Sequence, residues 1–257
     1  MRPDTPSDPN RTVHSWGAWT DEGAGPVVLA VHGLPGSVRD FRYLGGAVHD
    51  RFRLIRVDLP GFSGVPRSYP ATDAGAIEYL DRIVDLVDEP VIILGHSFGS
   101  TYATAYAVAH PEKVKGLALL APFGIRPHSG IKSLPNIKML KRVMKLPIVG
   151  KVIINRILSG FKKIGFRNIS DLDVRMTIET LSNFHFKAFE KHLRALTCPT
   201  FVAWAKDDHL IEPAIVEEMI SLLPAGPRFV FDEGGHNLQK FQAVEVADAL
   251  SEWVLSL

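Results

Sequence analysis

A serine in a sharp turn is the residue of this chain best placed to do chemistry. The apolar run at residues 91–94 is followed at once by residues 95–99, which match G-x-S-x-G around Ser97, and then by a helical stretch of small residues. A strand that turns directly into a helix strains its middle residue and exposes that side chain above the sheet. Gly95 and Gly99 are needed because a Cβ at either position would collide with the neighbouring strand or helix. The pattern predicts a nucleophile beside the amide donors of a helix N-terminus, which suits attack on a carbonyl carbon.

Two later segments supply candidates for the base and the acid that a serine nucleophile needs. His236 lies in a loop that contains two glycines and follows the last predicted strand. Asp207 and Asp208 follow the strand predicted at residues 200–204. Both segments lie at the carboxyl ends of strands, where an open parallel sheet builds its binding site. We therefore predict a catalytic triad of Ser97, Asp208 and His236, with Asp207 as the rival of Asp208.

The elements that would position these residues alternate between apolar runs and helical patterns. Such alternation predicts an α/β fold with a mostly parallel sheet and helices on both faces. Strands are predicted at residues 27–32, 53–58, 91–94, 114–120, 200–204 and 228–231. Helices are predicted near residues 39–48, 73–87, 100–109 and 213–222, and at the C-terminus, where apolar residues recur at helical spacing from Leu238 to Leu257. A loop rich in Pro, Gly and Ser is predicted at residues 59–71, and Thr72 or Asp73 is expected to begin the helix that follows.

Residues 125–195 differ in kind from the rest of the chain. They contain no clear strand, show helical patterns, and hold 15 basic and 4 acidic residues, a net charge of +11. The remainder holds 14 basic and 24 acidic residues, so the overall net charge of +1 hides two oppositely charged parts. We predict a core at residues 11–124 and 196–257, an inserted helical cap (lid) at residues 125–195, and a disordered tail at residues 1–10.

Three segments together resemble the α/β-hydrolase superfamily. Residues 31–37 are similar to the family's H-G-x-P-G oxyanion loop, and residues 95–99 match its nucleophile turn. Residues 58–64 are similar to its D-x-P-G-x-G segment, with Ser63 before the second glycine. The chain is identified as a serine esterase or lipase-like member with an inserted helical cap, and the resemblance covers nearly everything after the N-terminal tail. It implies the α/β-hydrolase fold.

The resemblance also bears on the acid and on the oxyanion hole. The acid segment of the superfamily usually reads G-x-x-D, and Ala205 stands in place of its glycine, which fits Asp208 best. No acid follows the strand that ends at residues 121–123, so the superfamily's alternative position for the acid is empty. The family pattern implies an oxyanion hole made by the backbone N–H groups of Leu34 and Phe98.

Composition restricts the class of protein further. The single cysteine, Cys198, excludes an internal disulfide, so no oxidising compartment is needed. The 10 histidines show no paired metal-ligand spacing, and the chain has neither G-x-x-x-x-G-K-[ST] nor G-x-G-x-x-G, so no metal or other cofactor is expected. Residues 1–10 contain three prolines and two aspartates without an apolar run, which is typical of neither a signal peptide nor a membrane span. A cytoplasmic protein is expected.

The sequence does not decide what the basic side chains of the cap contact. Its phenylalanines are predicted to form the underside of the cap over an apolar pocket, rather than a nucleic-acid surface: Phe161, Phe166, Phe184, Phe186 and Phe189. Its lysines and arginines either solvate an outer face or meet an anionic target. That target would be a phospholipid surface, an acidic carrier or a charged substrate, and no nucleic-acid partner is expected.

The predicted function is hydrolysis of a small-molecule carboxylic ester through an acyl-enzyme. Ser97 would attack the carbonyl carbon, His236 would move the proton, and Asp208 would orient the imidazole. Serine rather than aspartate at the nucleophile position argues against dehalogenase and epoxide-hydrolase chemistry, and the apolar cap favours hydrophobic acyl substrates. Thioesterase, perhydrolase, C–C hydrolase and lactonase chemistry use the same triad and stay open. A non-catalytic ligand-binding module on the same fold also stays open.

Overall fold

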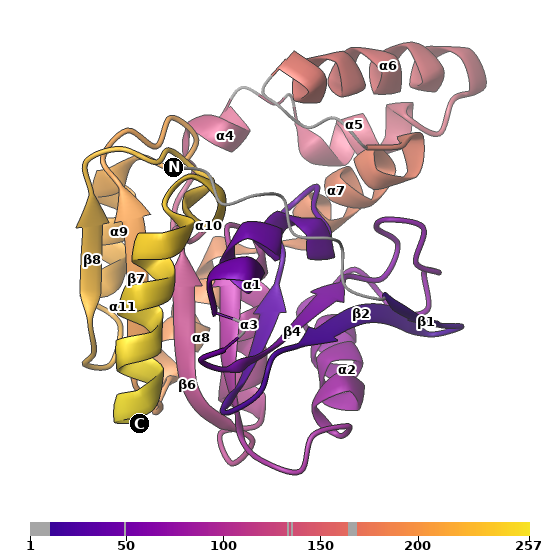
Figure 1. Ribbon diagram of the computed structural model, residues 1–257. Coiled ribbons are helices and arrows are strands. Elements are labelled where there is room, and N and C mark those ends of the chain that lie inside the picture. Colours follow the sequence, from indigo (N-terminus) through magenta and orange to yellow (C-terminus); the bar gives the residue numbers. More distant parts are fainter. Residues whose placement is uncertain (1–10, 49, 133, 135, 164–168) are drawn as a thin grey trace.

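One twisted sheet organises the chain, as the computed structural model in Figure 1 shows. The structure describes residues 11–48, 50–132, 134, 136–163 and 169–257, so the tail predicted at residues 1–10 lies outside the described residues. Within the described part, the strands lie in the order β1 (Thr12–His14), β2 (Gly17–Glu22), β4 (Arg53–Asp58), β3 (Val27–Val31), β5 (Val91–His96), β6 (Val114–Leu120), β7 (Thr200–Ala205) and β8 (Arg228–Phe231). β2 pairs antiparallel with β1 and β4, and the other neighbours pair in parallel. The carboxyl ends of β3 to β8 therefore meet at one edge of the sheet.

The predicted strands are all present, and each boundary lies within two residues of its predicted place. Strands β1 and β2 are not predicted from the sequence, because neither has an apolar run or a clean alternation. β2 ends in two acidic residues, and the Arg53 guanidinium of β4 donates to both carboxylate oxygens of Asp21 at 2.8 and 2.6 Å. Cross-strand pairing holds this edge of the sheet, and such pairing leaves no local pattern in the sequence.

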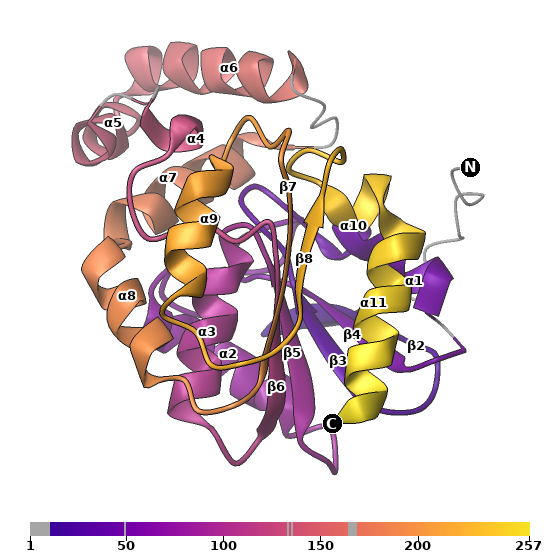
Figure 2. The ribbon, with the colours of Figure 1, turned by 90° about the vertical axis from the view of Figure 1, so that its left-hand side faces the viewer.

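Two layers of helices cover the faces of the sheet (Figure 2). One face carries α1 (Arg42–Val48), α10 (Leu238–Phe241) and α11 (Ala243–Ser256), and the other carries α2 (Asp73–Val84), α3 (Gly99–Ala109), α8 (Phe186–Ala195) and α9 (Pro213–Ile220). A short 3-10 helix, η1 (Val38–Phe41), precedes α1. Leu29 and Ile93 point into the apolar cluster beneath α2 and α3, while Val28 and Ile92 point into the cluster beneath α1 and α11. Both faces of these strands are buried, which explains their continuous apolar sequence.

The helix boundaries depart from the prediction in several places: Val38–Phe41 form a 3-10 helix, and α9 ends at Ile220, two residues early. The Thr72 side chain caps α2 by accepting a hydrogen bond from the backbone N–H of Gly75 at 3.3 Å, and α2 ends at Val84. The single closing helix is a wrong prediction, because the chain breaks at Gln242 between α10 and α11. The side-chain amide of Gln242 donates to the carbonyl oxygen of Glu233 at 2.8 Å, which ties the break to the loop after β8.

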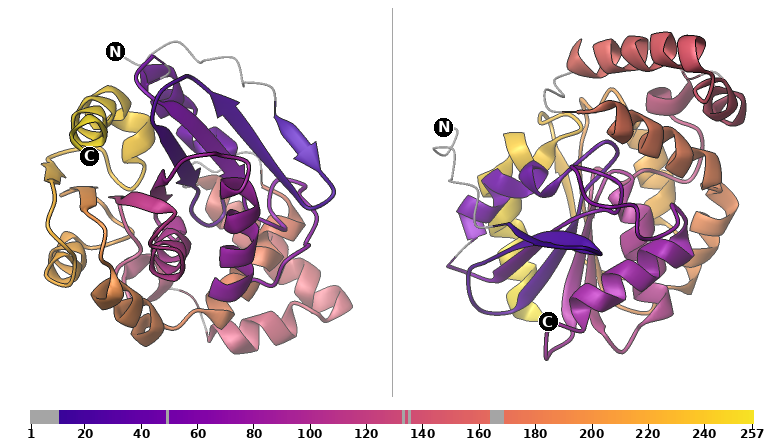
Figure 3. Two further views of the ribbon diagram at one scale, coloured as in Figure 1. Left: turned by 90° about the horizontal axis from the view of Figure 1, so that it is seen from below. Right: turned by 90° about the vertical axis from the view of Figure 1, so that its right-hand side faces the viewer.

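Cap-like helices lie between β6 and β7: α4 (Ser129–Lys132), α5 (Ile137–Val143), α6 (Pro147–Lys163), α7 (Asp171–Asn183) and α8. Leu140 and Met144 are buried with Ile154 in a small separate core. α8 packs differently, since its Phe189 and Leu193 join the main core beside α3. The limits of the cap at residues 125 and 195 stay a prediction. α6 lies farthest from the sheet, as Figure 1 and the right-hand view of Figure 3 show.

Candidate active site

The turn after β5 holds Ser97 in the strained conformation that the sequence predicts. Its φ is +51°, in the left-handed region that side chains rarely adopt. The turn has no room for a side chain on either flank. A Cβ on Gly95 would lie 2.5 Å from the Cα of Ser100, and a Cβ on Gly99 would lie 2.5 Å from the carbonyl oxygen of His32. The Ser97 side chain is therefore held at the carboxyl edge of the sheet, at the N-terminus of α3.

His236 reaches Ser97 from the loop after β8. Nε2 of His236 lies 2.7 Å from Oγ of Ser97, and Nδ1 lies 2.8 Å from Oδ2 of Asp208. A carboxylate can only accept a hydrogen bond, so Nδ1 carries the imidazole proton and Nε2 accepts the hydroxyl proton of Ser97. The fold thus brings three side chains from three distant segments into one hydrogen-bonded chain.

The two neighbouring acids have different partners. Oδ1 of Asp208 accepts hydrogen bonds from two backbone N–H groups just after it in the chain, at 2.8 and 3.0 Å, which leaves Oδ2 for His236. Asp207 instead accepts a hydrogen bond from the backbone N–H of Gly235 at 2.7 Å. Asp208 is therefore the acid that contacts the imidazole, and Asp207 fastens the loop that carries His236.

Asp208 is held in its ionised form. Burial by itself would raise the pKa of its carboxyl group, but the hydrogen bond from His236 and those from the backbone N–H groups favour the carboxylate. The net effect is a pKa below the usual value of an aspartate. A buried carboxylate beside Nδ1 stabilises positive charge on the imidazole, which a general base acquires when it takes a proton.

His96 fastens the other side of His236. Its Nε2–H donates to the backbone carbonyl oxygen of His236 at 2.8 Å, and its ring packs edge-on against Phe41 with ring centroids 6.4 Å apart. Burial, followed by the proximity of His236, lowers the pKa of His96 to about 3, so the ring is neutral at physiological pH. His96 thus joins the turn of Ser97 directly to the backbone of the histidine that Ser97 contacts.

We expect this buried neutral imidazole to weaken the folded protein in acid. An unfolded chain protonates histidine below about pH 6.5, whereas folded His96 is protonated only near 3. Between these values the unfolded state binds the extra proton, so its uptake lowers the free energy of unfolding as the pH falls. In His96→Gln, which keeps a side-chain N–H donor, the slope of unfolding free energy against pH should be smaller by about 1.4 kcal/mol per pH unit between about pH 4 and 6. Urea unfolding across this range measures both slopes, and equal slopes would contradict the prediction.

The backbone N–H groups of Leu34 and Phe98 are the donors that the family pattern assigns to an oxyanion hole. Both residues line the cavity that contains Ser97. In the described part of the chain, neither N–H group donates a hydrogen bond. The loop of Leu34 lies against the nucleophile, since a Cβ on Gly33 would fall 2.8 Å from the Cβ of Ser97. Two such donors on one cavity, beside a hydroxyl group, have the composition of an oxyanion hole.

Two buried polar residues support the loop of Leu34. His32 accepts a hydrogen bond at Nε2 from the backbone N–H of Leu59 at 3.0 Å. Asp58 accepts hydrogen bonds from the backbone N–H of Val38 at 2.9 Å and from Nε of Arg11 at 2.6 Å. These contacts tie the segment after β4 to the segment after β3.

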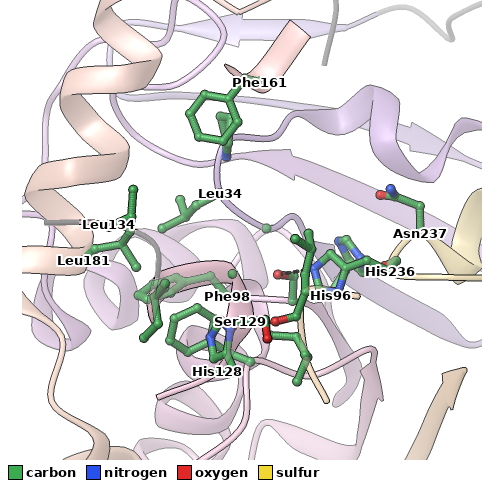
Figure 4. A pocket seen from close by; sticks show the side chains of 18 of the residues that line it. Leu34, His96, Phe98, His128, Ser129, Leu134, Phe161, Leu181, His236 and Asn237 are labelled. Atoms are coloured by element: carbon green, nitrogen blue, oxygen red, sulfur yellow. Dashed lines mark hydrogen bonds between the residues drawn. The ribbon is translucent and has the colours of Figure 1, made fainter. Parts of the chain in front are cut away.

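A cavity of about 400 Å³ opens over Ser97, with lining residues from both the core and the cap. Figure 4 shows Leu134 and Leu181 on one side of it and His96 and His236 on the other. The lining is mostly apolar, and the lining residues that the structure describes include no lysine or arginine. Its volume lies in the range of sites that bind small molecules.

The comparison with known families agrees with the fold and the site. Residues 18–250 match the family described as "Alpha/beta hydrolase of unknown function (DUF1057)". The chain belongs to this α/β-hydrolase family. The family was expected from the nucleophile turn and the two loop segments, and the match confirms that expectation.

Relatives of this α/β hydrolase carry several different names. A 2-hydroxy-6-oxononadienedioate/2-hydroxy-6-oxononatrienedioate hydrolase of Cupriavidus pinatubonensis is 28% identical over 249 residues, which cover 84% of this chain and 82% of the relative. Epoxide hydrolase 3 of Xenopus tropicalis is 22% identical, with 89% and 71% covered. Among solved structures, a thermophilic esterase from Thermogutta terrifontis matches with a TM-score of 0.76 at 24% identity, over 93% of this chain and 94% of the esterase. The structural match confirms the predicted fold class.

The sequence assigns five phenylalanines of this α/β hydrolase to the underside of the cap. The structure divides those it describes between the cavity and the main core. Phe161 lines the cavity, Phe184 packs edge-on against Phe98 with ring centroids 5.4 Å apart, and Phe189 is buried in the main core. Phe166 lies outside the described residues. The cap therefore contributes aromatic rings directly beside the turn of Ser97.

His128 is a cavity residue that the sequence does not single out. Its Nδ1–H donates to the carbonyl oxygen of Leu210 at 3.0 Å, and its ring meets Phe123 edge-on with centroids 4.6 Å apart. Burial lowers the pKa of His128 to about 4, so it is neutral at physiological pH. Because Leu210 follows Asp208 by two residues, His128 ties the start of the cap to the loop of the acid. Among the described residues, no group of three or more His, Cys, Asp or Glu side chains is arranged to hold a metal ion.

Proposed function

We propose that this α/β hydrolase cleaves carboxylic esters that have an apolar acyl group. The observation that carries the proposal is the hydrogen-bonded chain from Oγ of Ser97 through His236 to Asp208, with links of 2.7 and 2.8 Å. This chain lies beside an apolar cavity lined by Leu34 and Phe98. Among the described residues, the backbone N–H groups of these two residues donate no hydrogen bond. Nucleophile, base, orienting acid and oxyanion donors are the parts that acyl transfer requires.

Each part has one role in the reaction. Oγ of Ser97 attacks the carbonyl carbon while Nε2 of His236 takes the hydroxyl proton, and Asp208 holds the imidazole in the tautomer that can accept it. The N–H groups of Leu34 and Phe98 bind the oxyanion of the tetrahedral intermediate. His236 then gives the proton to the leaving alkoxide, and a water molecule, deprotonated by the same imidazole, releases the acyl group from the serine.

The lining of the cavity favours a neutral acyl group. A carboxylate buried there would lose its hydration, and the described lining offers no lysine or arginine to compensate. The second candidate function is C–C bond hydrolysis, because the relative from Cupriavidus pinatubonensis is named as the hydrolase of a dienedioate. Such a substrate carries two carboxylates, which this lining does not match. Cleavage of thioesters and lactones and perhydrolysis require the same triad, and the panel described below tests the first two.

A matched pair of chromogenic esters tests this preference. We expect hydrolysis of p-nitrophenyl butanoate, and slower hydrolysis of the p-nitrophenyl hemisuccinate by at least about tenfold in kcat/KM, because the second acyl group ends in a charge that the cavity cannot pair. Release of p-nitrophenolate measures both rates. The panel also contains the matching butanoyl thioester and lactone and a 2-hydroxy-6-oxo-dienedioate.

The outcomes separate the candidate functions. Turnover of the dienedioate without turnover of either ester would favour the C–C hydrolase. A fluorophosphonate probe should label the wild-type protein and not Ser97→Ala. No labelling of folded wild-type protein, together with no turnover, would favour a non-catalytic binding module.

A further inference from the structure

The outer part of the cap has an unusual charge. Residues 137–162, which span α5, the turn after it and nearly all of α6, contain seven lysines and arginines and no aspartate or glutamate. Lys141 pairs with Glu179 at 3.5 Å. The other six are exposed, and none of them forms an ion pair within the described residues: Lys138, Arg142, Lys145, Lys151, Arg156 and Lys162. Positive charge on this surface is therefore not neutralised by the protein.

The same surface exposes aliphatic side chains. Ile148 is 80% exposed and Val152, one helical turn later, is 63% exposed. Three further apolar side chains on or beside these helices are about half exposed: Met139, Leu146 and Val149. We call these five apolar residues, together with the six exposed basic residues, the cap face. Exposed apolar side chains such as Ile148 and Val152 cost free energy of hydration. We therefore expect a binding partner to cover the cap face.

Helix α6 connects the cap face to the cavity. On its inner side, Ile157, Gly160 and Phe161 line the cavity over Ser97, while Ile154 is buried in the small core of the cap. Ile148 and Val152 on the same helix are exposed, and the helix as a whole lies farthest from the sheet (Figures 1 and 3). Helix α6 therefore contributes residues both to the cap face and to the lining of the cavity.

We propose that the cap face binds the surface of an anionic phospholipid bilayer. A helix with aliphatic side chains between lysines and arginines binds such a surface by inserting the apolar groups among the acyl chains and pairing the cations with headgroups. The lysine stems lie along the apolar layer while their ammonium groups stay in water. No helix among the described residues is long and apolar enough to cross a membrane.

The composition of the cap face favours lipid over an acidic protein. Protein interfaces are enriched in aromatic residues, methionine and arginine, and depleted of lysine at their centre. The cap face has no aromatic residue, four of its five apolar residues are Leu, Ile or Val, and four of its six basic residues are lysines. The binding does not depend on the chemistry proposed for Ser97, because no residue of the cap face lines the cavity.

Vesicle sedimentation with the full chain tests the proposal. Wild-type protein should bind vesicles of phosphatidylcholine mixed with phosphatidylglycerol, bind weakly to phosphatidylcholine alone, and dissociate as salt screens the charges. The triple variant Lys145→Gln, Lys151→Gln, Arg156→Gln should lower the partition coefficient about 100-fold, since each basic residue near an anionic leaflet contributes about fivefold. The double variant Ile148→Gln, Val152→Gln should lower it by at least about tenfold.

Matched variants elsewhere on the surface serve as controls. Lys115→Gln, Lys187→Gln, Lys191→Gln removes the same charge from exposed positions on β6 and α8. Leu86→Gln, Leu255→Gln alters two apolar side chains that are 55% and 70% exposed and lie outside the cap. Both controls should bind vesicles nearly as well as the wild type. All four variants should hydrolyse a soluble ester at the wild-type rate.

Three results would overturn the proposal. The first is no binding to mixed vesicles at low salt. The second is an equal loss of binding in the cap-face variants and their controls, which would indicate general charge attraction. The third is binding to an acidic protein such as an acyl carrier, but not to vesicles, which would assign the cap face to a protein partner. None of these results bears on ester hydrolysis, so the two proposals fail separately.

Discussion

Replacement of Ser97 by alanine is expected to lower kcat for p-nitrophenyl butanoate by about 10⁵- to 10⁶-fold. Alanine removes the only atom that can form the acyl-enzyme, while His236 keeps its hydrogen bond to Asp208 and the cavity keeps its shape. The rate that remains would come from substrate binding and from the N–H groups of Leu34 and Phe98. Steady-state release of p-nitrophenolate, corrected for hydrolysis without protein, measures the loss.

Ser129→Ala is a matched control for this variant. Ser129 lines the same cavity, but its hydroxyl group donates to Glu212 at 2.9 Å rather than to His236. Both variants should unfold at nearly the wild-type temperature, and Ser129→Ala should keep most of the activity. A Ser97→Ala protein that hydrolysed the ester at a rate near the wild type would show that the nucleophile lies elsewhere.

The central strands and the nucleophile turn could be predicted because their signals are local. A parallel strand covered on both faces is a continuous apolar run, and Val91–His96 and Val114–Leu120 are such runs. The turn at Ser97 needs glycine at residues 95 and 99, so its signal lies in one short motif, although the space at Gly99 is limited by the carbonyl oxygen of His32 on a distant strand end. Local patterns therefore recovered strands β3 to β8 within two residues of their bounds, and they placed Ser97 in its turn.

The rest of the site depends on contacts between distant segments. His96 donates to a carbonyl group 140 residues away, and His128 donates to one 82 residues away. Nothing near His128 in the sequence distinguishes it from a surface histidine such as His209, which is exposed. The place of His96 beside Ser97 predicts a structural role for it, but does not reveal the carbonyl group to which it donates. The break between α10 and α11 is also without a local signal, because no proline or other helix stop lies at Gln242. Its side chain instead hydrogen-bonds to the carbonyl oxygen of Glu233 in the preceding loop. These features follow from the fold and could not be derived before it.

The choice between Asp207 and Asp208 is another case in which geometry decides. Adjacent residues at the end of a strand point in different directions, so both acids can be near the imidazole and only one can face it. In the structure, Nδ1 of His236 hydrogen-bonds to Asp208, and the backbone N–H of Gly235, in the loop that carries His236, donates to Asp207. The two carboxylates therefore have separable roles, and conservative substitutions should separate them by a large factor.

Asp208→Asn is expected to lower kcat by about 10⁴-fold with little change in KM. Two backbone N–H groups donate to Oδ1 of Asp208, so the amide oxygen of asparagine must occupy that position. Its NH₂ group then faces Nδ1 of His236 and donates to it. The imidazole must carry its proton on Nε2 instead, where it can no longer accept the proton of Ser97.

Asp207→Asn should cost far less, about tenfold or below, because the amide oxygen can still accept the N–H of Gly235 that Asp207 accepts at 2.7 Å. Steady-state kinetics of both variants against p-nitrophenyl butanoate measure the two factors. If the activity of Asp208→Asn rises with pH, hydroxide is removing the proton of Ser97 in place of the imidazole. That result would indicate that the imidazole is in the wrong tautomer and not that the variant is misfolded. Equal losses in the two variants would mean that the loop as a whole, and not the hydrogen bond from Asp208 to His236, sets the rate.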